Sequence, residues 1–107
     1  MKKKTAASKR AALPRAADYA SSFFKDWQRL SRSGRYDMNR LRHVMLLLIG
    51  GETLGPEWSA HALTGNWKGF RECHIGGDFL LIYRLEDSGK HELIVFVRAG
   101  THAELFE

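Results

Sequence analysis

Three runs of strand-forming residues lie close together in the second half of the chain, and their spacing restricts the fold more than any other feature. They span residues 68–75, 79–85 and 92–98, and only short separators of turn-forming residues lie between them. Such short connections predict antiparallel pairing in a three-stranded meander. The middle run is apolar on both of its faces, so we expect it to be the central strand.

Two helices are predicted ahead of these strands. Apolar residues recur at helical spacing across Ala20–Leu30, with Asp18 as the candidate N-cap. Asp37 is the candidate N-cap of the second helix, and the glycines at 50–51 tolerate a left-handed backbone at its end. A short edge strand is also expected around 13–17. The pattern predicts an α+β domain, with an N-terminal helical hairpin packed on a small, mainly antiparallel sheet of three to four strands.

Length and charge predict one domain with a basic tail. A chain of 107 residues can bury one hydrophobic core, which we assign to residues 13–107. Residues 1–12 are interpreted as a flexible tail, because five of the first ten residues are Lys or Arg. The formal charge of +5 favours a polyanionic or acidic partner. Without the tail the domain is close to neutral, so the positions of individual cations matter more than the total charge.

The sequence predicts a cytoplasmic protein. The longest unbroken apolar run, residues 44–49, is too short to cross a bilayer, and no apolar signal core follows the basic N-terminus. Cys73 is the one cysteine, so it cannot form an internal disulfide, and we interpret it as a packing residue.

Five histidines are present, and two of them are interpreted as ordinary surface residues. His43 lies off the apolar stripe of the second helix, and His91 follows a lysine at a turn. His61 lies in a long connecting segment, residues 51–67, that is rich in Gly, Pro, Thr and Ser. Long loops in a compact domain are often functional, which makes His61 a candidate site residue.

Further polar residues converge at one edge of the predicted meander. His74 and Asp78 flank the Gly-Gly turn between the first two strands, and the third strand brings Arg98 and then His102 to the same edge. Imidazoles transfer protons near neutral pH, a carboxylate can orient them, and Lys or Arg can stabilise a phosphorane-like transition state. The combination suits metal-free RNA cleavage through attack by a 2′-hydroxyl. The candidate RNA-binding residues are Lys68, Arg71, Arg98 and the base-stacking Phe106.

Simpler interpretations remain open for the same residues. His74 and Asp78 suit an ordinary turn, Arg98 suits a solvated strand edge, and Phe106 suits a core contact of the C-terminus. Three histidines and an aspartate could also bind zinc, but their spacing matches no common zinc signature and no cysteine pair accompanies them. We therefore predict neither a metal nor a cofactor.

Two segments in the second half of the chain, HALTGNWKGFRECHIGGDFLLIYRLED and VFVRAGTHAELFE, closely resemble the YafQ-like branch of the RelE/ParE superfamily, the toxins of type II toxin–antitoxin systems. The family pattern has an H-x-L loop, a G-x-W-[KR]-G-[YF]-R strand, a histidine ending that strand, an acidic residue before the next strand and a closing R-x-G-T-H-x-x-L-F. All five elements occur here in order. The resemblance implies the RelE-like microbial RNase fold.

The resemblance also implies a ribosome-dependent endoribonuclease that cleaves mRNA in the A site of the 70S ribosome. The family's acid–base residues fall on His61, His74, Asp78 and His102, and its base-stacking aromatic falls on Phe106. We assign His102 as the general acid, His74 with Asp78 as the base or base-orienting pair, and His61 as a further proton-handling or phosphate-contacting group. The assigned phosphate binders are Lys68, Arg71 and Arg98.

The partner implied by the resemblance is a cognate acidic antitoxin of the DinJ/RelB-like, ribbon-helix-helix type, bound in a heterotetramer, with the free toxin a monomer. Two features depart from the family: the longer basic N-terminal extension, and Phe79 at a position where tryptophan is common. A gyrase-inhibiting toxin of the ParE type and a non-catalytic RNA-binding module are the alternatives. The histidines together with Phe106 favour the nuclease.

Overall fold

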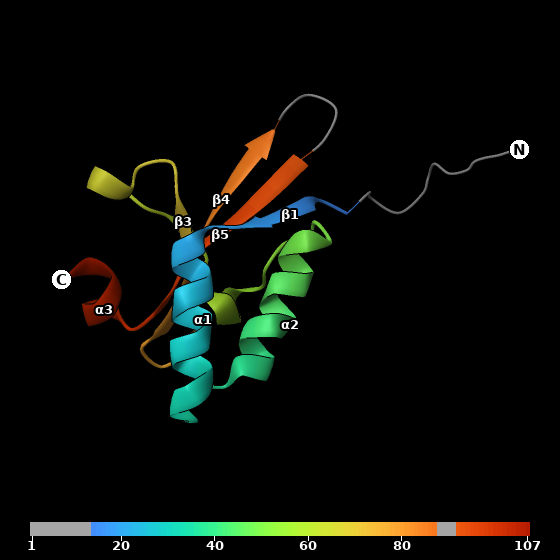
Figure 1. Cartoon of the computed structure of the whole chain (residues 1–107). Coiled ribbons are helices and arrows are strands. Elements are labelled where there is room, and N and C mark those ends of the chain that lie inside the picture. The colour runs from blue at the N-terminus through green and yellow to red at the C-terminus, as the bar shows by residue number, and fades with distance from the viewer. Residues whose placement is uncertain (1–13, 88–91) are drawn as a thin grey trace, which may run out of the picture.

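A five-stranded sheet forms the centre of the computed structural model, which describes residues 14–87 and 92–107 (Figure 1). The strand order is β1-β5-β4-β3-β2. β1 pairs with β5 in parallel, and the other neighbours are antiparallel. The strands are β1 (Ala16–Tyr19), β2 (His61–Ala62), β3 (Arg71–Gly76), β4 (Phe79–Asp87) and β5 (Glu92–Gly100). The predicted N-terminal tail and His91 lie outside the described residues.

The predicted meander is confirmed as β3, β4 and β5, with β4 at the centre of the sheet. The predicted number of three to four strands was too low, because the connecting segment after the second helix contributes the two-residue strand β2. The expected strand at 13–17 lies at Ala16–Tyr19 instead. Pro14 has no amide hydrogen and stays outside the pairing. The α+β class is confirmed.

Two long helices, α1 (Ser21–Ser33) and α2 (Met38–Ile49), form the predicted hairpin. Asp37 caps α2 as predicted, since its Oδ1 accepts a hydrogen bond from Arg40 N at 2.9 Å. The prediction for Asp18 was wrong, because this residue belongs to β1 and the N-cap of α1 is Ala20. Short helical segments follow in the second half of the chain: η1 (Pro56–Trp58), η2 (Gly65–Trp67) and α3 (His102–Phe106).

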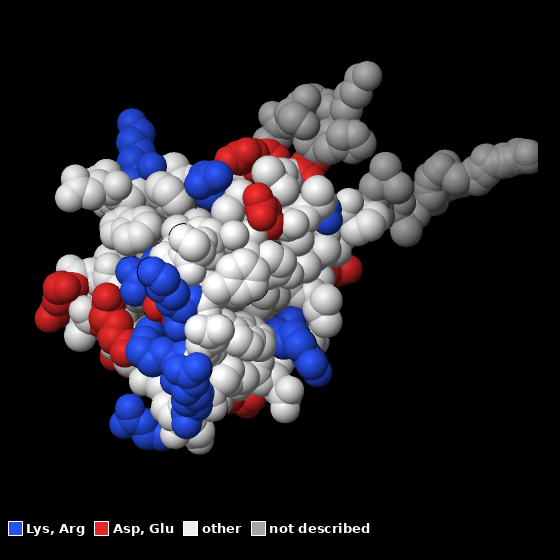
Figure 2. Space-filling view, viewed as in Figure 1, with Lys and Arg blue, Asp and Glu red and all other residues white. Residues whose placement is uncertain are grey.

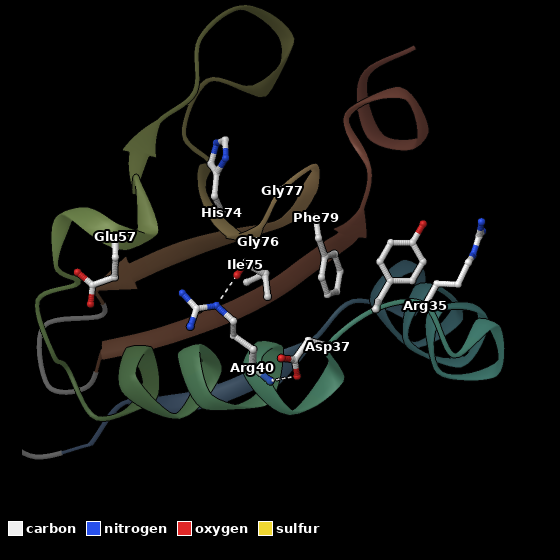
Figure 3. A pocket seen from close by; sticks show the side chains of 10 residues that line it. Arg35, Asp37, Arg40, Glu57, His74, Ile75, Gly76, Gly77 and Phe79 are labelled. Carbon is white, nitrogen blue, oxygen red and sulfur yellow. Dashed lines mark hydrogen bonds between the residues drawn. The ribbon is translucent and has the colours of Figure 1, made fainter.

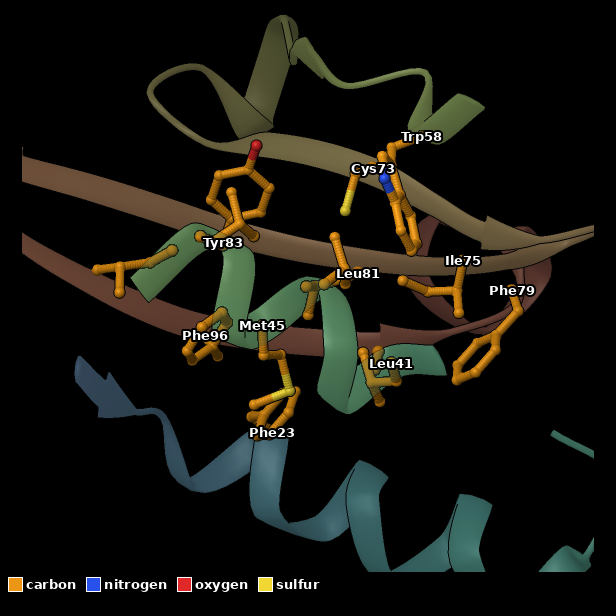
Figure 4. Packing of buried hydrophobic residues seen from close by; sticks show 14 of the residues in the cluster. Phe23, Leu41, Met45, Trp58, Cys73, Ile75, Phe79, Leu81, Tyr83 and Phe96 are labelled. Atoms are coloured by element: carbon orange, nitrogen blue, oxygen red, sulfur yellow. The ribbon is translucent and has the colours of Figure 1, made fainter. Parts of the chain in front are cut away.

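The hydrophobic core lies between the sheet and the two long helices. Side chains from β3 and β4, such as Cys73 and Leu81, meet Leu41 and Phe23 from the helices (Figure 4). A smaller cluster around Leu80 lies on the opposite face, where, of the residues that the structure describes, those of α3 and of the segment between β2 and β3 provide the cover. That thinly covered face leaves room for a site. In the described ranges, no helix is long and apolar enough to cross a membrane.

Side chains of helix α1 also form hydrogen bonds with backbone groups in the part of β5 that extends past β1. Ser22 Oγ donates a hydrogen bond to the carbonyl oxygen of Val97 at 2.7 Å, and Asp26 Oδ2 accepts one from the amide of Ala99 at 3.0 Å. These side chains replace backbone partners that a longer β1 would have supplied. The end of β5, which leads into α3, is therefore fixed to α1.

Candidate active site

Pairing between β2 and β3 places two histidines around one carboxylate. His61 is the register partner of Glu72, and its Nε2 lies 3.1 Å from Glu72 Oε2. His74, two residues along β3, places its Nε2 3.4 Å from the same oxygen. The two imidazole rings are 6.2 Å apart. A hydrogen bond at 2.9 Å between His61 Nδ1 and the carbonyl oxygen of Ser59 fixes the orientation of the first ring.

Glu72 was not identified from the sequence. It is 4% exposed, and its Oε1 has no hydrogen-bond partner within the described ranges. A buried carboxylate is costly unless charged or polar groups compensate it, and here the compensation comes from the two imidazoles. Side chains two apart on a strand share a face, so the position of Glu72 relative to His74 was the available signal.

Asp78 contacts the start of α3. Its Oδ1 accepts a hydrogen bond from the backbone amide of His102 at 3.0 Å. Thr101 and Glu104 form a reciprocal capping box at the same helix start. The structure therefore brings Asp78 to His102, as the topology predicted. The carboxylate within reach of the His74 ring, however, is that of Glu72, so the predicted pairing of His74 with Asp78 is not formed here.

A cleft of about 330 Å³ opens beside these groups on the thinly covered face of the sheet. His102 and Phe106 lie one helical turn apart on α3, with ring centres 5.0 Å apart. Trp67 meets Phe106 edge-on at 5.8 Å. Trp67 belongs to the family motif, but the sequence assigned it no role in the site. The lining residues are His61, Leu63, Thr64, Trp67, Glu72, His102 and Phe106.

Two of the predicted phosphate binders differ in their access to this cleft. Lys68 is exposed directly after η2, close in the chain to Trp67. Arg71 alternates with Glu72 along β3 and therefore shares the opposite face with Cys73. Its register partner on β4 is Tyr83. The structure thus separates Arg71 from the histidines and leaves Lys68 free to approach a ligand on the open face.

Arg98 is paired with a buried carboxylate. Its Nε donates to Asp26 Oδ2 at 2.7 Å and its Nη2 donates to Oδ1 at 3.2 Å. Burial alone would raise the pKa of Asp26, but hydrogen bonds from Arg98, the Ala99 amide and Arg29 outweigh it, so the pKa lies below its ordinary value. Arg98 consequently joins β5 to α1. Figure 2 shows further Lys and Arg side chains gathered near α1, with carboxylates beside them. The exposed cations of α1 itself are Lys25, Arg29 and Arg32.

Two residues excluded from the site are placed as predicted. His43 is exposed on α2, where its ring lies 6.0 Å from that of Trp58. Cys73 is completely buried in the core. Burial, followed by the nearby charge of Glu72, raises the pKa of the Cys73 thiol to about 12. A thiol in this state is a poor nucleophile, which confirms the packing interpretation.

Comparison with known proteins matches residues 15–107 to the family described as the bacterial toxin of type II toxin–antitoxin systems, YafQ. The chain belongs to the YafQ toxin family. It is 39% identical over 95 residues to the mRNA interferase toxin YafQ of Escherichia coli K12, an alignment that covers 88% of this chain and 98% of the relative. The resemblance drawn from the sequence motifs is therefore confirmed.

Solved structures of YafQ-like toxins have the same fold as this family member. The toxin in the E. coli DinJ-YafQ complex aligns with a TM-score of 0.75 and 39% identity, covering 87% of this chain and 99% of that one. A copper-bound mutant toxin from Helicobacter pylori aligns with a TM-score of 0.77 and 39% identity, covering 86% and 99%. In the described part of the present toxin, no group of three or more His, Cys, Asp or Glu side chains is arranged to hold a metal ion.

Proposed function

We propose that this YafQ-family toxin is an endoribonuclease that cleaves mRNA on the ribosome by metal-free general acid–base catalysis. The observation that carries the proposal is the position of His61 and His74 around Glu72, beside a cleft that His102 enters from α3. Several proton-transfer groups in one open cleft suit a reaction that needs both an acid and a base.

In the proposed reaction, one imidazole of the pair around Glu72 takes the proton of a ribose 2′-hydroxyl. The 2′-oxygen then attacks the adjacent phosphorus, and the bond from phosphorus to the 5′-oxygen breaks. His102 supplies a proton to the leaving 5′-oxygen. The products are a 2′,3′-cyclic phosphate and a 5′-hydroxyl. The Glu72 carboxylate stabilises the imidazolium formed in the first step, because an opposite charge 3 to 4 Å away favours the protonated ring.

The remaining predicted residues receive positioning or binding roles. Asp78 holds the first turn of α3 and thereby positions His102. Phe106 offers an aromatic face for base stacking, supported by Trp67, and Lys68 contacts a phosphate. Arg71 and Arg98 were also predicted to bind phosphate. Because Arg71 lies on the opposite face of the sheet from the histidines and Asp26 engages Arg98, we propose that their main contribution is structural.

The decisive experiment compares His102→Ala with His43→Ala, a matched change at an exposed histidine outside the cleft. Each protein is produced in growing cells, and mRNA 5′ ends are mapped together with ribosome positions. We expect new ends at ribosomal A sites with the unaltered toxin and with His43→Ala, and none with His102→Ala. Undiminished toxicity of His102→Ala without new mRNA ends would instead favour a gyrase-directed toxin. Parallel assays on RNA without ribosomes test ribosome dependence.

The proposed protein partner is a cognate antitoxin with an acidic segment, as the basic residues over α1 suggest. The E. coli relative is found in a complex with DinJ. We propose a heterotetramer of two toxins and two antitoxins, and a monomeric toxin when free. Light scattering during titration with the product of the neighbouring gene measures the mass of the free toxin and the mass of the complex. Failure of the two proteins to associate would contradict this choice of partner.

A further inference from the structure

A second, larger pocket adjoins the site on the side facing α2. Its volume is about 570 Å³, and His74 is part of its wall. Because His74 also approaches Glu72, which lines the first cleft, the two hollows adjoin each other at His74. Figure 3 shows Arg40 and Glu57 at one end of this pocket and Arg35 at the other. An RNA strand centred on the histidines would place neighbouring nucleotides in the two hollows.

The guanidinium of Arg40 is held in place by contacts within the protein. Its Nε donates a hydrogen bond to the carbonyl oxygen of Ile75, and its central carbon lies 4.2 Å from the ring centre of Trp58. Asp37, also in the pocket wall, accepts a hydrogen bond from the backbone amide of Arg40. The contacts with Ile75 and Trp58 fix the guanidinium plane and leave the two terminal nitrogens to donate to a ligand.

The pocket carries both charges, which argues against a phosphate as its main ligand. Arg35 and Arg40 line the pocket together with Asp37 and Glu57, so the carboxylates offset the attraction for an anion. A nucleobase, by contrast, needs donors and acceptors together. Tyr36 is half-buried in the pocket wall, with its ring centre 5.0 Å from that of the buried Phe79, and it supplies the apolar surface that a base requires. The chemistry of the pocket therefore matches a base better than a backbone phosphate.

Guanine fits this arrangement of donors and acceptors best among the four bases. Its N7 and O6 accept the paired hydrogen bonds that a guanidinium donates, and its N1–H and N2–H₂ donate to a carboxylate. We propose that the pocket binds a guanine flanking the cleaved bond, with Arg40 on the N7/O6 edge and Glu57 on the N1/N2 edge. This inference rests on the proposed RNA cleavage, and it adds a base preference to that function.

The test measures kcat/KM on ribosomes programmed with mRNAs that differ at one flanking position. Guanine, inosine and adenine are placed in turn on each side of the cleaved bond. Inosine lacks only the 2-amino group. Glu57→Gln should reduce the preference for guanine over inosine by roughly tenfold. Glu52→Gln, an equally exposed change outside the pocket wall, should retain that preference.

Arg40→Met provides the second arm, with Arg42→Met as its control two residues away on α2. The methionine keeps an apolar contact with Trp58 but cannot donate to O6 and N7. Cleavage of the guanine and inosine mRNAs should therefore fall to the rate of the adenine mRNA. Glu57 is exposed, so Glu57→Gln should fold, and the first arm remains informative if Arg40→Met does not.

The possible outcomes distinguish a failure of the guanine assignment from a failure of the proposed RNA cleavage on which it rests. If the unaltered toxin cleaves none of these mRNAs, both ideas fail. If it cleaves them with the same guanine preference as Glu57→Gln, the pocket assignment fails alone. A Glu57→Gln variant that loses affinity for the antitoxin while retaining its base preference would show a protein-binding surface, and would also overturn the base assignment.

Discussion

Glu72 Oε2 lies 3.1 Å from His61 Nε2, across the short pairing of β2 with β3. This contact gives the thinly covered face of the sheet a buried negative charge directly beside an imidazole. The second imidazole, His74, approaches the same oxygen from β3 itself. A single carboxylate thus connects two of the histidines to which we assign proton transfer.

Replacing Glu72 by glutamine should reduce the cleavage rate without weakening the fold. The amide keeps the shape but cannot stabilise an imidazolium, so kcat should fall by roughly a hundredfold while KM changes little. The free energy of unfolding should not decrease, because the buried charge has one unpaired oxygen. Single-turnover cleavage and urea unfolding measure the two quantities. A stability loss matching the activity loss would show a purely structural role.

Phe106→Ala should weaken RNA binding more than it slows the chemical step. A stacked base is stabilised by about 1 to 3 kcal/mol, so KM should rise at least severalfold while kcat stays close to that of the unaltered toxin. Phe106→Trp keeps an aromatic face and should retain most of the binding. Kinetics on programmed ribosomes separate the two constants. Equal loss in both variants would mean that Phe106 acts only through packing against Trp67.

Asp26→Asn should destabilise the protein by about 3 kcal/mol, because it leaves Arg98 without its buried partner. In a double-mutant cycle with Arg98→Met, the two losses should be less than additive by about 1 to 3 kcal/mol. Urea midpoints provide the energies. Asp18→Asn is the control, since that exposed carboxylate accepts, among the described residues, a hydrogen bond from the adjacent amide alone. Additive losses would rule out the proposed coupling.

The same ion pair predicts an acid-dependent loss of stability. The pKa of Asp26 in the folded protein lies below 3.8, because the hydrogen bonds it accepts outweigh its burial. Its stabilising contribution is therefore complete above about pH 4 and disappears as the pH falls through the lower folded value. Unfolding should be measured at pH 6 and at a series of lower pH values. Asp26→Asn should lose less stability over this range than the unaltered protein.

Cys73 should resist alkylation in the folded toxin. It is fully buried with a thiol pKa of about 12, so iodoacetamide at pH 8 should label it only after unfolding. Mass spectrometry with and without urea measures the labelled fraction. Rapid labelling of the native protein would mean that the sheet opens easily beside α2.

The sequence by itself was enough to predict the meander and the helical hairpin, and to name the histidines and Phe106 as candidate site residues. Their signals are local, because strand alternation, helical spacing and family motifs can be read along the chain. Antiparallel order also predicted that Asp78 and His102 would lie at the same edge of the sheet, and in the structure the amide of His102 donates to Asp78.

The tertiary structure alone decided which charges face the site. The pairing of β2 with β3 made Glu72 the common partner of His61 and His74, and strand alternation turned Arg71 to the opposite face. Arg98 forms an ion pair with Asp26, whose position depends on how α1 packs beside the end of β5. A sequence shows which residues are charged but not which of them pair, because an ion pair depends on distances between segments that are far apart in the chain.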